Sequence, residues 1–202
     1  GSENQNLPGF IAMSPRAQPR GKLANWGSSF LPGAYSGCYV NIGSMHKDRI
    51  IPDLVNQYLP TSQQRQQADL LSELNRLDLG RQQQDQQLEA SIEAMELAFR
   101  MQMAVPDLMD LSDESKATQS LYGLDDSFAN TRKYGRLCLV ARRMVERGVR
   151  FIELTCTGGN GDRWDQHGGL VDGHTKNSRA IDRPVAGLIR DLKQRGLLDE
   201  TL

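Results

Sequence analysis

The residues best suited to chemistry lie in one glycine-rich loop between Thr155 and Gly169. In this loop Asp165 offers a carboxylate oxygen and His167 offers an imidazole nitrogen, while the flanking glycines let the backbone approach a ligand closely. A mixed set of oxygen and nitrogen donors suits zinc, manganese or a similar divalent ion. We therefore take Asp165 and His167 as candidate metal ligands, with a hydrogen-bonded turn as the alternative interpretation.

Two residues near this pair are weaker candidates for the same site. His174 could be a third ligand, a group that orients a ligand, or a residue that caps or packs the next helix, and the sequence favours capping or packing. Asp162 belongs to a Gly-Asn-Gly-Asp run, which is more typical of a turn. Further away, His46 has no partner at a metal-binding spacing, so we expect it at the surface or in an interface.

A nucleophile is the other requirement for covalent catalysis, and the sequence contains no recognisable motif for one. There is no Gly-x-Ser-x-Gly elbow, no Gly-x-x-x-x-Gly-Lys phosphate loop and no constellation of Cys and His. The catalytic residues are therefore unknown from the sequence.

The elements on either side of the loop indicate an α/β fold. Val149–Leu154 is a short run with β-branched residues that predicts a strand, and a helix expected from about Ser127–Arg147 stops before it at Gly148. A helix expected from about Thr175–Arg195 follows the loop and is closed by Gly196. Ligands of open α/β sheets bind beyond the carboxyl ends of the strands, where this loop lies. The apolar residues expected on the inner faces are Leu137, Val140, Ala141 and Met144 in the first helix, and Ile181, Val185, Leu188, Ile189 and Leu192 in the second.

The upstream part of the chain divides into two segments. Residues 1–60 are rich in Pro, Gly, Asn and Ser, and they predict irregular structure with short strands. We expect their aromatic residues to pack this segment onto a neighbouring core, with contact to a substrate as the alternative. These aromatic residues are Trp26, Phe30, Tyr35 and Tyr39. Residues 61–147 are helical in pattern: a capping box at Thr61 is followed by leucines at helical spacing, including Leu70 and Leu74.

Composition excludes several classes of protein. The chain has 202 residues, a net charge of -1 and 38% hydrophobic residues, which suits one globular domain or a large part of one. Its Lys and Arg are scattered among Asp and Glu, so we expect no nucleic-acid partner. The sequence has no run of about 18 apolar residues that would span a membrane. Its 3 cysteines form no C-x-x-C pair, so they suggest neither a disulfide framework nor a zinc knuckle.

The order of the elements predicts that the chain is an internal fragment of one larger domain. Residues 148–202 contain a single clear strand, and a lone strand leaves its backbone donors and acceptors unpaired. Apolar residues also follow Gly196, as they do where a helix leads into another parallel strand. We therefore expect the missing strands, and with them the rest of the active site, to lie outside this sequence.

Five stretches of the chain together resemble one family. They are residues 1–10, 25–37 and 97–102, the stretch Trp164-Asp165-Gln166-His167-Gly168, and residues 191–199. In this order they are similar to the sulfatase-like family catalogued as domain of unknown function 1501, within the alkaline-phosphatase superfamily. The resemblance implies an exported, periplasmic or extracellular protein with an incomplete part of an alkaline-phosphatase-like α/β sandwich and a mostly parallel sheet.

The same resemblance implies a metal-dependent hydrolase of sulfate or phosphate esters, acting on a small-molecule or saccharide ester. Asp165 and His167 would bind a divalent metal, either zinc, manganese, calcium or magnesium, and His174 and Asp162 would orient a ligand or contact the substrate. The Asp-x-His spacing is narrower than the spacing common in the superfamily. The alternative is an exported binding or structural protein that keeps the fold without catalysis. In both cases this chain alone is expected to be inactive.

Overall fold

The computed structural model describes residues 6–14, 21–31, 35–42, 60, 62–63, 65–67, 69–70, 73–74, 97, 100–101, 104–105, 107–156 and 164–201. Within them it shows a three-stranded sheet and a group of helices. The strands are β1 (Phe10–Ser14), β2 (Cys38–Asn41) and β3 (Phe151–Leu154), in the order β2-β1-β3, and both pairings are parallel. The expected mixed α/β fold with a parallel sheet is therefore confirmed.

The expectation that the Phe151–Leu154 strand stands alone is wrong. This strand, β3, is paired with β1 from Phe10↔Phe151 to Met13↔Leu154. The short strands predicted within residues 1–60 are confirmed by β1 and β2. Their pairing with Phe151–Leu154 was missed because β1 is an apolar run of only five residues in a segment rich in Pro, Gly, Asn and Ser. β1 is the most buried strand, since Ile11, Ala12 and Met13 are almost fully covered. The lone-strand argument for a fragment consequently fails on the described structure.

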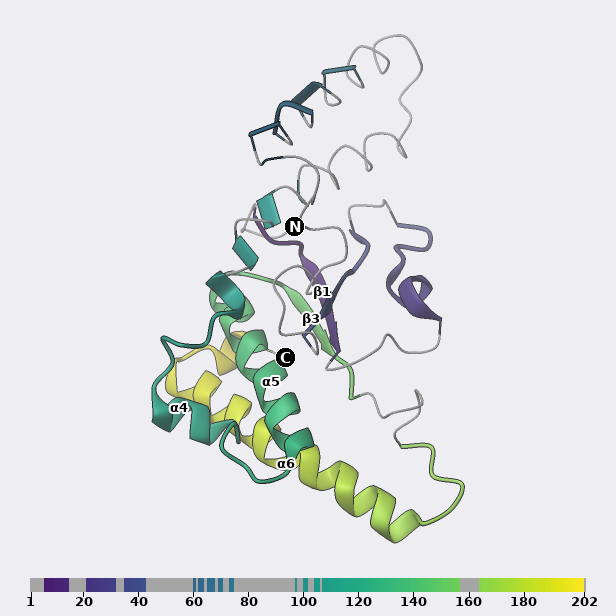
Figure 1. Ribbon diagram of the computed structural model, residues 1–202, viewed down its shortest axis with the longest axis vertical. Coiled ribbons are helices and arrows are strands. Elements are labelled where there is room, and N and C mark those ends of the chain that lie inside the picture. Colours follow the sequence, from purple (N-terminus) through teal and green to yellow (C-terminus); the bar gives the residue numbers. More distant parts are fainter. Residues whose placement is uncertain are drawn as a thin grey trace.

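The described residues include three continuous helices and two short 3-10 helices beside the sheet. The helices are α4 (Lys116–Leu121), α5 (Ala129–Glu146) and α6 (Leu170–Gln194), and the 3-10 helices are η1 (Lys22–Trp26) and η3 (Leu198–Glu200). The helices α4, α5 and α6 gather on one side of the sheet, and the amino-terminal part of α6 projects beyond them (Figure 1). Described positions between residues 62 and 74 are also helical, but Leu70 and Leu74 there are exposed.

Helix α5 matches its prediction closely. Its four expected inner residues, from Leu137 to Met144, are all buried in the main core, together with residues from β1 and β2 such as Met13 and Val40. Gly148 ends the turn after α5 with a φ of 79°, a left-handed conformation that glycine adopts without a steric penalty. The predicted stop is therefore confirmed.

The buried face of α6 overlaps the predicted face only in part. Val185 and Ile189 are exposed, while Ile181 and Leu188 are partly buried and Leu192 is buried. The buried stripe consists mainly of small or polar residues at alternating spacings of three and four. These are Asn177, Ala180, Pro184, Gly187 and Asp191.

Small residues let this stripe approach its neighbours closely. A Cβ atom built on Gly187 would lie 2.6 Å from the backbone carbonyl oxygen of Leu121. Helix contact, not side-chain hydrophobicity, therefore selects the buried face of α6. Pro184 is buried inside α6, where it has no N–H group to donate to the carbonyl of Ala180.

The aromatic residues of the amino-terminal segment divide into two pairs. Trp26 and Tyr39 are buried and stacked, with ring centroids 5.0 Å apart, beside Ala12 of β1. Phe30 and Tyr35 are exposed instead. The packing prediction is thus right for the first pair and wrong for the second.

Candidate functional site

The carboxyl edge of the sheet carries polar residues that the sequence analysis missed. Ser14 ends β1 and is paired in register with Asn41, which ends β2. Thr155 follows β3, and both its backbone N–H and its hydroxyl donate to the carbonyl of Met13, at 2.9 and 3.0 Å. In the sequence, a polar residue after each short apolar run was the signal that could have indicated this polar edge. These residues fix the point from which the candidate loop departs.

One of these residues has a buried aromatic partner. Ser14 is fully buried, and its hydroxyl forms a hydrogen bond with the side chain of Tyr39. Burial raises the pKa of Tyr39, and the hydrogen bond to Ser14 opposes part of that rise. Tyr39 consequently keeps its proton under physiological conditions, so this edge of the sheet is polar but carries no charge from the phenol.

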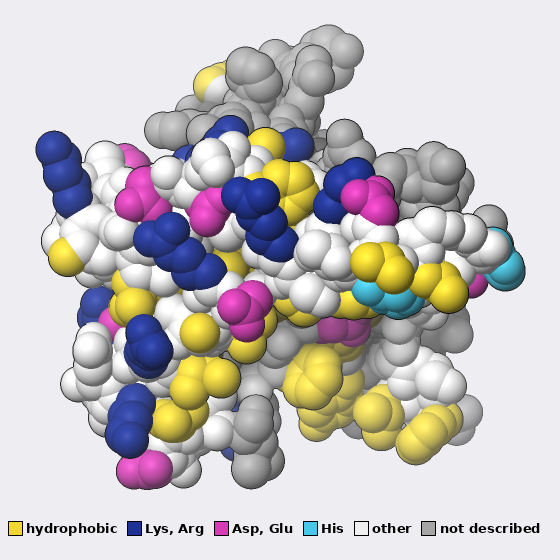
Figure 2. All heavy atoms as spheres, turned by 90° about the horizontal axis from the view of Figure 1, so that it is seen from below, with side chains coloured by type: hydrophobic (Ala, Val, Ile, Leu, Met, Phe, Trp, Pro, Cys, Tyr) yellow, Lys and Arg dark blue, Asp and Glu magenta, His cyan; other side chains and the backbone are white. Residues whose placement is uncertain are grey.

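The structure brings the two candidate ligands together. The Nε2 atom of His167 lies 2.8 Å from the Oδ1 atom of Asp165, and the two side chains are 88% and 55% exposed. They lie in the segment that leads into the projecting end of α6 (Figure 1). Seen from below, histidine side chains gather at this end of the molecule, beside hydrophobic side chains (Figure 2). The pair is therefore open to solvent and within reach of a ligand.

His174 does not cap α6, so that interpretation is wrong. The helix begins at Leu170, five residues earlier than expected, and its N-cap is Gly169 with a φ of 62° and no side-chain hydrogen bond. Within α6, the ring of His174 stacks on the ring of Trp164, with centroids 5.8 Å apart and planes 30° apart. The packing alternative thus describes His174. Asp162 and His46 lie outside the described residues.

The carboxylate oxygen and imidazole nitrogen of the pair fit a divalent metal, but the described residues supply too few ligands for a complete site. An oxygen and an imidazole nitrogen in contact can both face one ion once the contact between them opens. Zinc normally has four ligands. Across the part of the chain that the structure describes, no group of three or more His, Cys, Asp and Glu residues could hold a metal ion. Asp165 and His167 therefore form part of a coordination sphere at most, and their ligand role stays a prediction.

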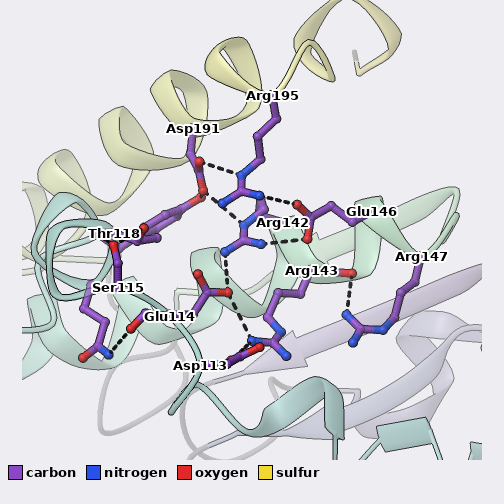
Figure 3. A network of polar contacts seen from close by, with 12 residues as sticks. Asp113, Glu114, Ser115, Thr118, Arg142, Arg143, Glu146, Arg147, Asp191 and Arg195 are labelled. Carbon is purple, nitrogen blue, oxygen red and sulfur yellow. Dashed lines mark hydrogen bonds and ion pairs between the residues drawn. The ribbon is translucent and has the colours of Figure 1, made fainter.

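A second cluster of charged residues lies at the other end of α6 (Figure 3). At its centre the guanidinium of Arg142 contacts Glu114 at 2.5 Å, Glu146 at 2.7 Å and Asp191 at 3.1 Å. The contact to Asp191 is an ion pair without hydrogen-bond alignment, since the Nε atom of Arg142 has no hydrogen-bond acceptor. Asp191 also accepts from Arg195 at 2.8 Å. We name these five residues the buried ion network.

Tyr122 joins the buried ion network through its hydroxyl, which donates to Asp191 at 2.9 Å. The pKa of Tyr122 is raised well above its usual range, first by burial and then by the hydrogen bond to Asp191 and the negative charge of that carboxylate. Every charge in the network faces a partner of opposite sign. The arrangement ties α5 and α6 together and leaves no group free for chemistry.

A shallow cavity of about 480 Å³ lies between α4 and α6 and does not include the candidate ligands. Its lining residues are Ala117, Ser120, Leu121, Arg183, Ala186, Gly187 and Arg190. Arg183 is already held there by Ser120 and Asp125. The cavity therefore adds no carboxylate or imidazole donor to the site.

No helix among the described residues is both long enough and apolar enough to cross a membrane.

Comparison with known proteins identifies the family. A family model described as a protein of unknown function, DUF1501, matches residues 1–202. No curated protein and no solved structure matched the chain. Since the match extends over the entire sequence, the chain belongs to the DUF1501 family.

Proposed function

We propose that this chain is part of a metal-dependent hydrolase of sulfate or phosphate esters, in which Asp165 and His167 are two ligands of a divalent ion. The observation that carries the proposal is the contact of 2.8 Å between their donor atoms in a loop open to solvent. An exposed contact between polar side chains contributes little to stability, so a role in binding is a better reason for this geometry than a role in folding.

The place of the pair in the chain is consistent with this role. The loop departs from the carboxyl end of β3, and ligands of open α/β folds bind at that end of the sheet. When bound, a divalent ion would act as a Lewis acid that activates a nucleophile and neutralises charge on the transferred group. Zinc, manganese, calcium and magnesium all remain in the proposal.

In the proposed site, the two candidate ligands of this chain would bind the metal ion. Asp165 and His167 would hold the ion, and the contact between them keeps the two donors at one place before it arrives. A small-molecule or saccharide ester would approach from the solvent side. The nucleophile and the remaining ligands are not identified. Export to the periplasm or the cell exterior belongs to the proposal through the sulfatase-like resemblance.

The test compares metal content and hydrolysis in the intact protein that carries this chain. Asp165→Asn and His167→Gln should each lower the content of zinc or manganese at least about tenfold, and hydrolysis of 4-nitrophenyl sulfate or phosphate should fall with it. The matched control is Asp172→Asn, because Asp172 is an exposed carboxylate at the start of α6 that pairs with Lys176. This control should match the wild type.

Two results would overturn the proposal. Metal content that does not depend on Asp165 and His167 would remove the ligand assignment. Metal that binds through the pair without hydrolysis of either ester would favour the alternative, an exported binding or structural protein.

A further inference from the structure

The residues around the candidate ligands alternate in what they contact. Trp164 and Gln166 contact the first turns of α6, whereas Asp165 and His167 contact each other and the solvent. The backbone forms a tight turn here, because the N–H of Gln166 donates to the carbonyl of Trp164 at 3.0 Å, so the expected hydrogen-bonded turn is present at the pair. Two of the four residues therefore bind the loop to the helix, and the other two are presented away from it.

The first of these contacts is the aromatic stack of Trp164 on His174. Both residues are exposed in part, so the stack lies at the surface and no core packing enforces it. His174 lies within α6, whose backbone hydrogen bonds fix its place. Because its ring faces Trp164, His174 serves here as a platform for the loop.

The second contact is that of Gln166 with Gly173. A Cβ atom built on Gly173 would lie 2.1 Å from the Oε1 atom of Gln166, so only a residue without a side chain leaves room for this amide. Glycine is unfavourable inside a helix. The contact with Gln166 supplies a physical reason for its presence at this position of α6.

We propose that Trp164 and Gln166 are positioning residues that hold Asp165 and His167 in place through His174 and Gly173. This inference rests on the proposed function, since it concerns the same metal site. It assigns His174 to support of the loop and not to the ligand set. The two contacts act on alternate residues of one short segment, so they fix the side of the loop on which both candidate ligands lie.

The main test is a pair of glycine substitutions with zinc alone as the probe, measured by isothermal titration calorimetry. Gly173→Ala should displace the Gln166 amide and weaken zinc binding about tenfold. It should not lower the melting temperature, because alanine favours the helix. Gly27→Ala is the matched control, because Gly27 lies outside this loop and its Cβ would meet only the carbonyl oxygen of Ala24 at 3.8 Å, and it should bind zinc like the wild type. Trp164→Ala should weaken binding, and Trp164→Phe should restore it by keeping an aromatic ring.

The outcomes separate this proposal from the proposed function. If Asp165→Asn abolishes zinc binding but Gly173→Ala and Trp164→Ala bind like the wild type, the positioning role is wrong while the ligand role stands. If the wild type binds no zinc, the ligand role fails. In that case nuclear Overhauser contacts between the rings of Trp164 and His174 test the positioning contacts without metal. Absence of these contacts in the wild type would overturn the positioning proposal as well.

Discussion

The two ends of α6 carry similar charged contacts in opposite surroundings. At the carboxyl-terminal end, Arg195 meets Asp191 at 2.8 Å, and their side chains are 37% and 6% exposed. At the amino-terminal end, His167 meets Asp165 at the same 2.8 Å, but their side chains are 88% and 55% exposed. Solvent screens the second contact more strongly than the first, in which the Asp191 carboxylate is buried. Equal distances therefore imply very different energies, and the end that contributes least to stability is the one available to bind a ligand.

The largest expected effect comes from removing the centre of the buried ion network. Arg142→Ala would remove the cation that Glu114, Glu146 and Asp191 share. Arg143 would still pair with Glu114, and Arg195 with Glu146 and Asp191. We therefore expect the free energy of unfolding to fall by about 3 kcal/mol, the lower end for loss of one partner of a buried pair. Urea unfolding followed by circular dichroism measures this change. Lys133→Ala, an exposed position on the same helix, is the control, and a loss below about 1 kcal/mol for Arg142→Ala would contradict the comparison.

A smaller effect is expected from Tyr122→Phe, which removes only the hydroxyl that donates to Asp191. Loss of a hydrogen bond to a charged acceptor should cost about 2 kcal/mol at neutral pH. The pKa of Tyr122 is raised in the folded protein, first by burial and then by Asp191. Its contribution is therefore complete below the unfolded pKa of about 10, and it declines as the pH rises above that value.

The pH dependence gives this second prediction its own check. The difference in unfolding free energy between the wild type and Tyr122→Phe should be constant near neutral pH and should narrow above about pH 10. A difference that stays the same or widens in this alkaline range would show that Tyr122 is not held in its neutral form by the buried ion network.

The smallest effect is expected at the exposed pair. Asp165→Asn and His167→Gln should each change the free energy of unfolding by less than about 0.5 kcal/mol, because exposed contacts between polar side chains contribute little. The same urea experiment provides the measurement. A loss above about 1 kcal/mol would mean that the pair is part of the folding core, and the contrast between the two ends of α6 would disappear.

The sequence predicted those parts of the fold that depend on local pattern. The inner face of α5 and the strand at Phe151–Leu154 follow from periodicity and β-branched residues, and both are confirmed. The buried face of α6 was not predictable in this way, because Ala180 and Gly187 carry no strong apolar signal. Arg142 and Asp191 are far apart in the sequence, so no local spacing reveals that they meet.

The candidate site was predictable to a similar extent. Residue type and spacing selected Asp165 and His167, and the structure places them in contact, although their role as ligands is still a prediction. The stack of Trp164 on His174 could not be predicted because the start of α6 was expected at Thr175. The helix begins at Leu170, directly after glycines that are typical of a loop. Whether Trp164 can reach His174 depends on where the helix begins. The first residues of α6, such as Val171, are exposed, so apolar periodicity gives no signal for that boundary.

Pro184 has a consequence for how motion spreads along α6. A proline has no amide hydrogen, so the ladder of backbone hydrogen bonds is interrupted between Ala180 and Pro184. On the amino-terminal side, residues 170–176 have no buried side chain, while the buried stripe begins at Asn177. The helix therefore divides into an exposed unit that carries the loop and a docked unit that packs on the core, and the missing hydrogen bond lies within the docked unit. A shift of the exposed unit together with the loop would spread along the helix only as far as this gap in the ladder.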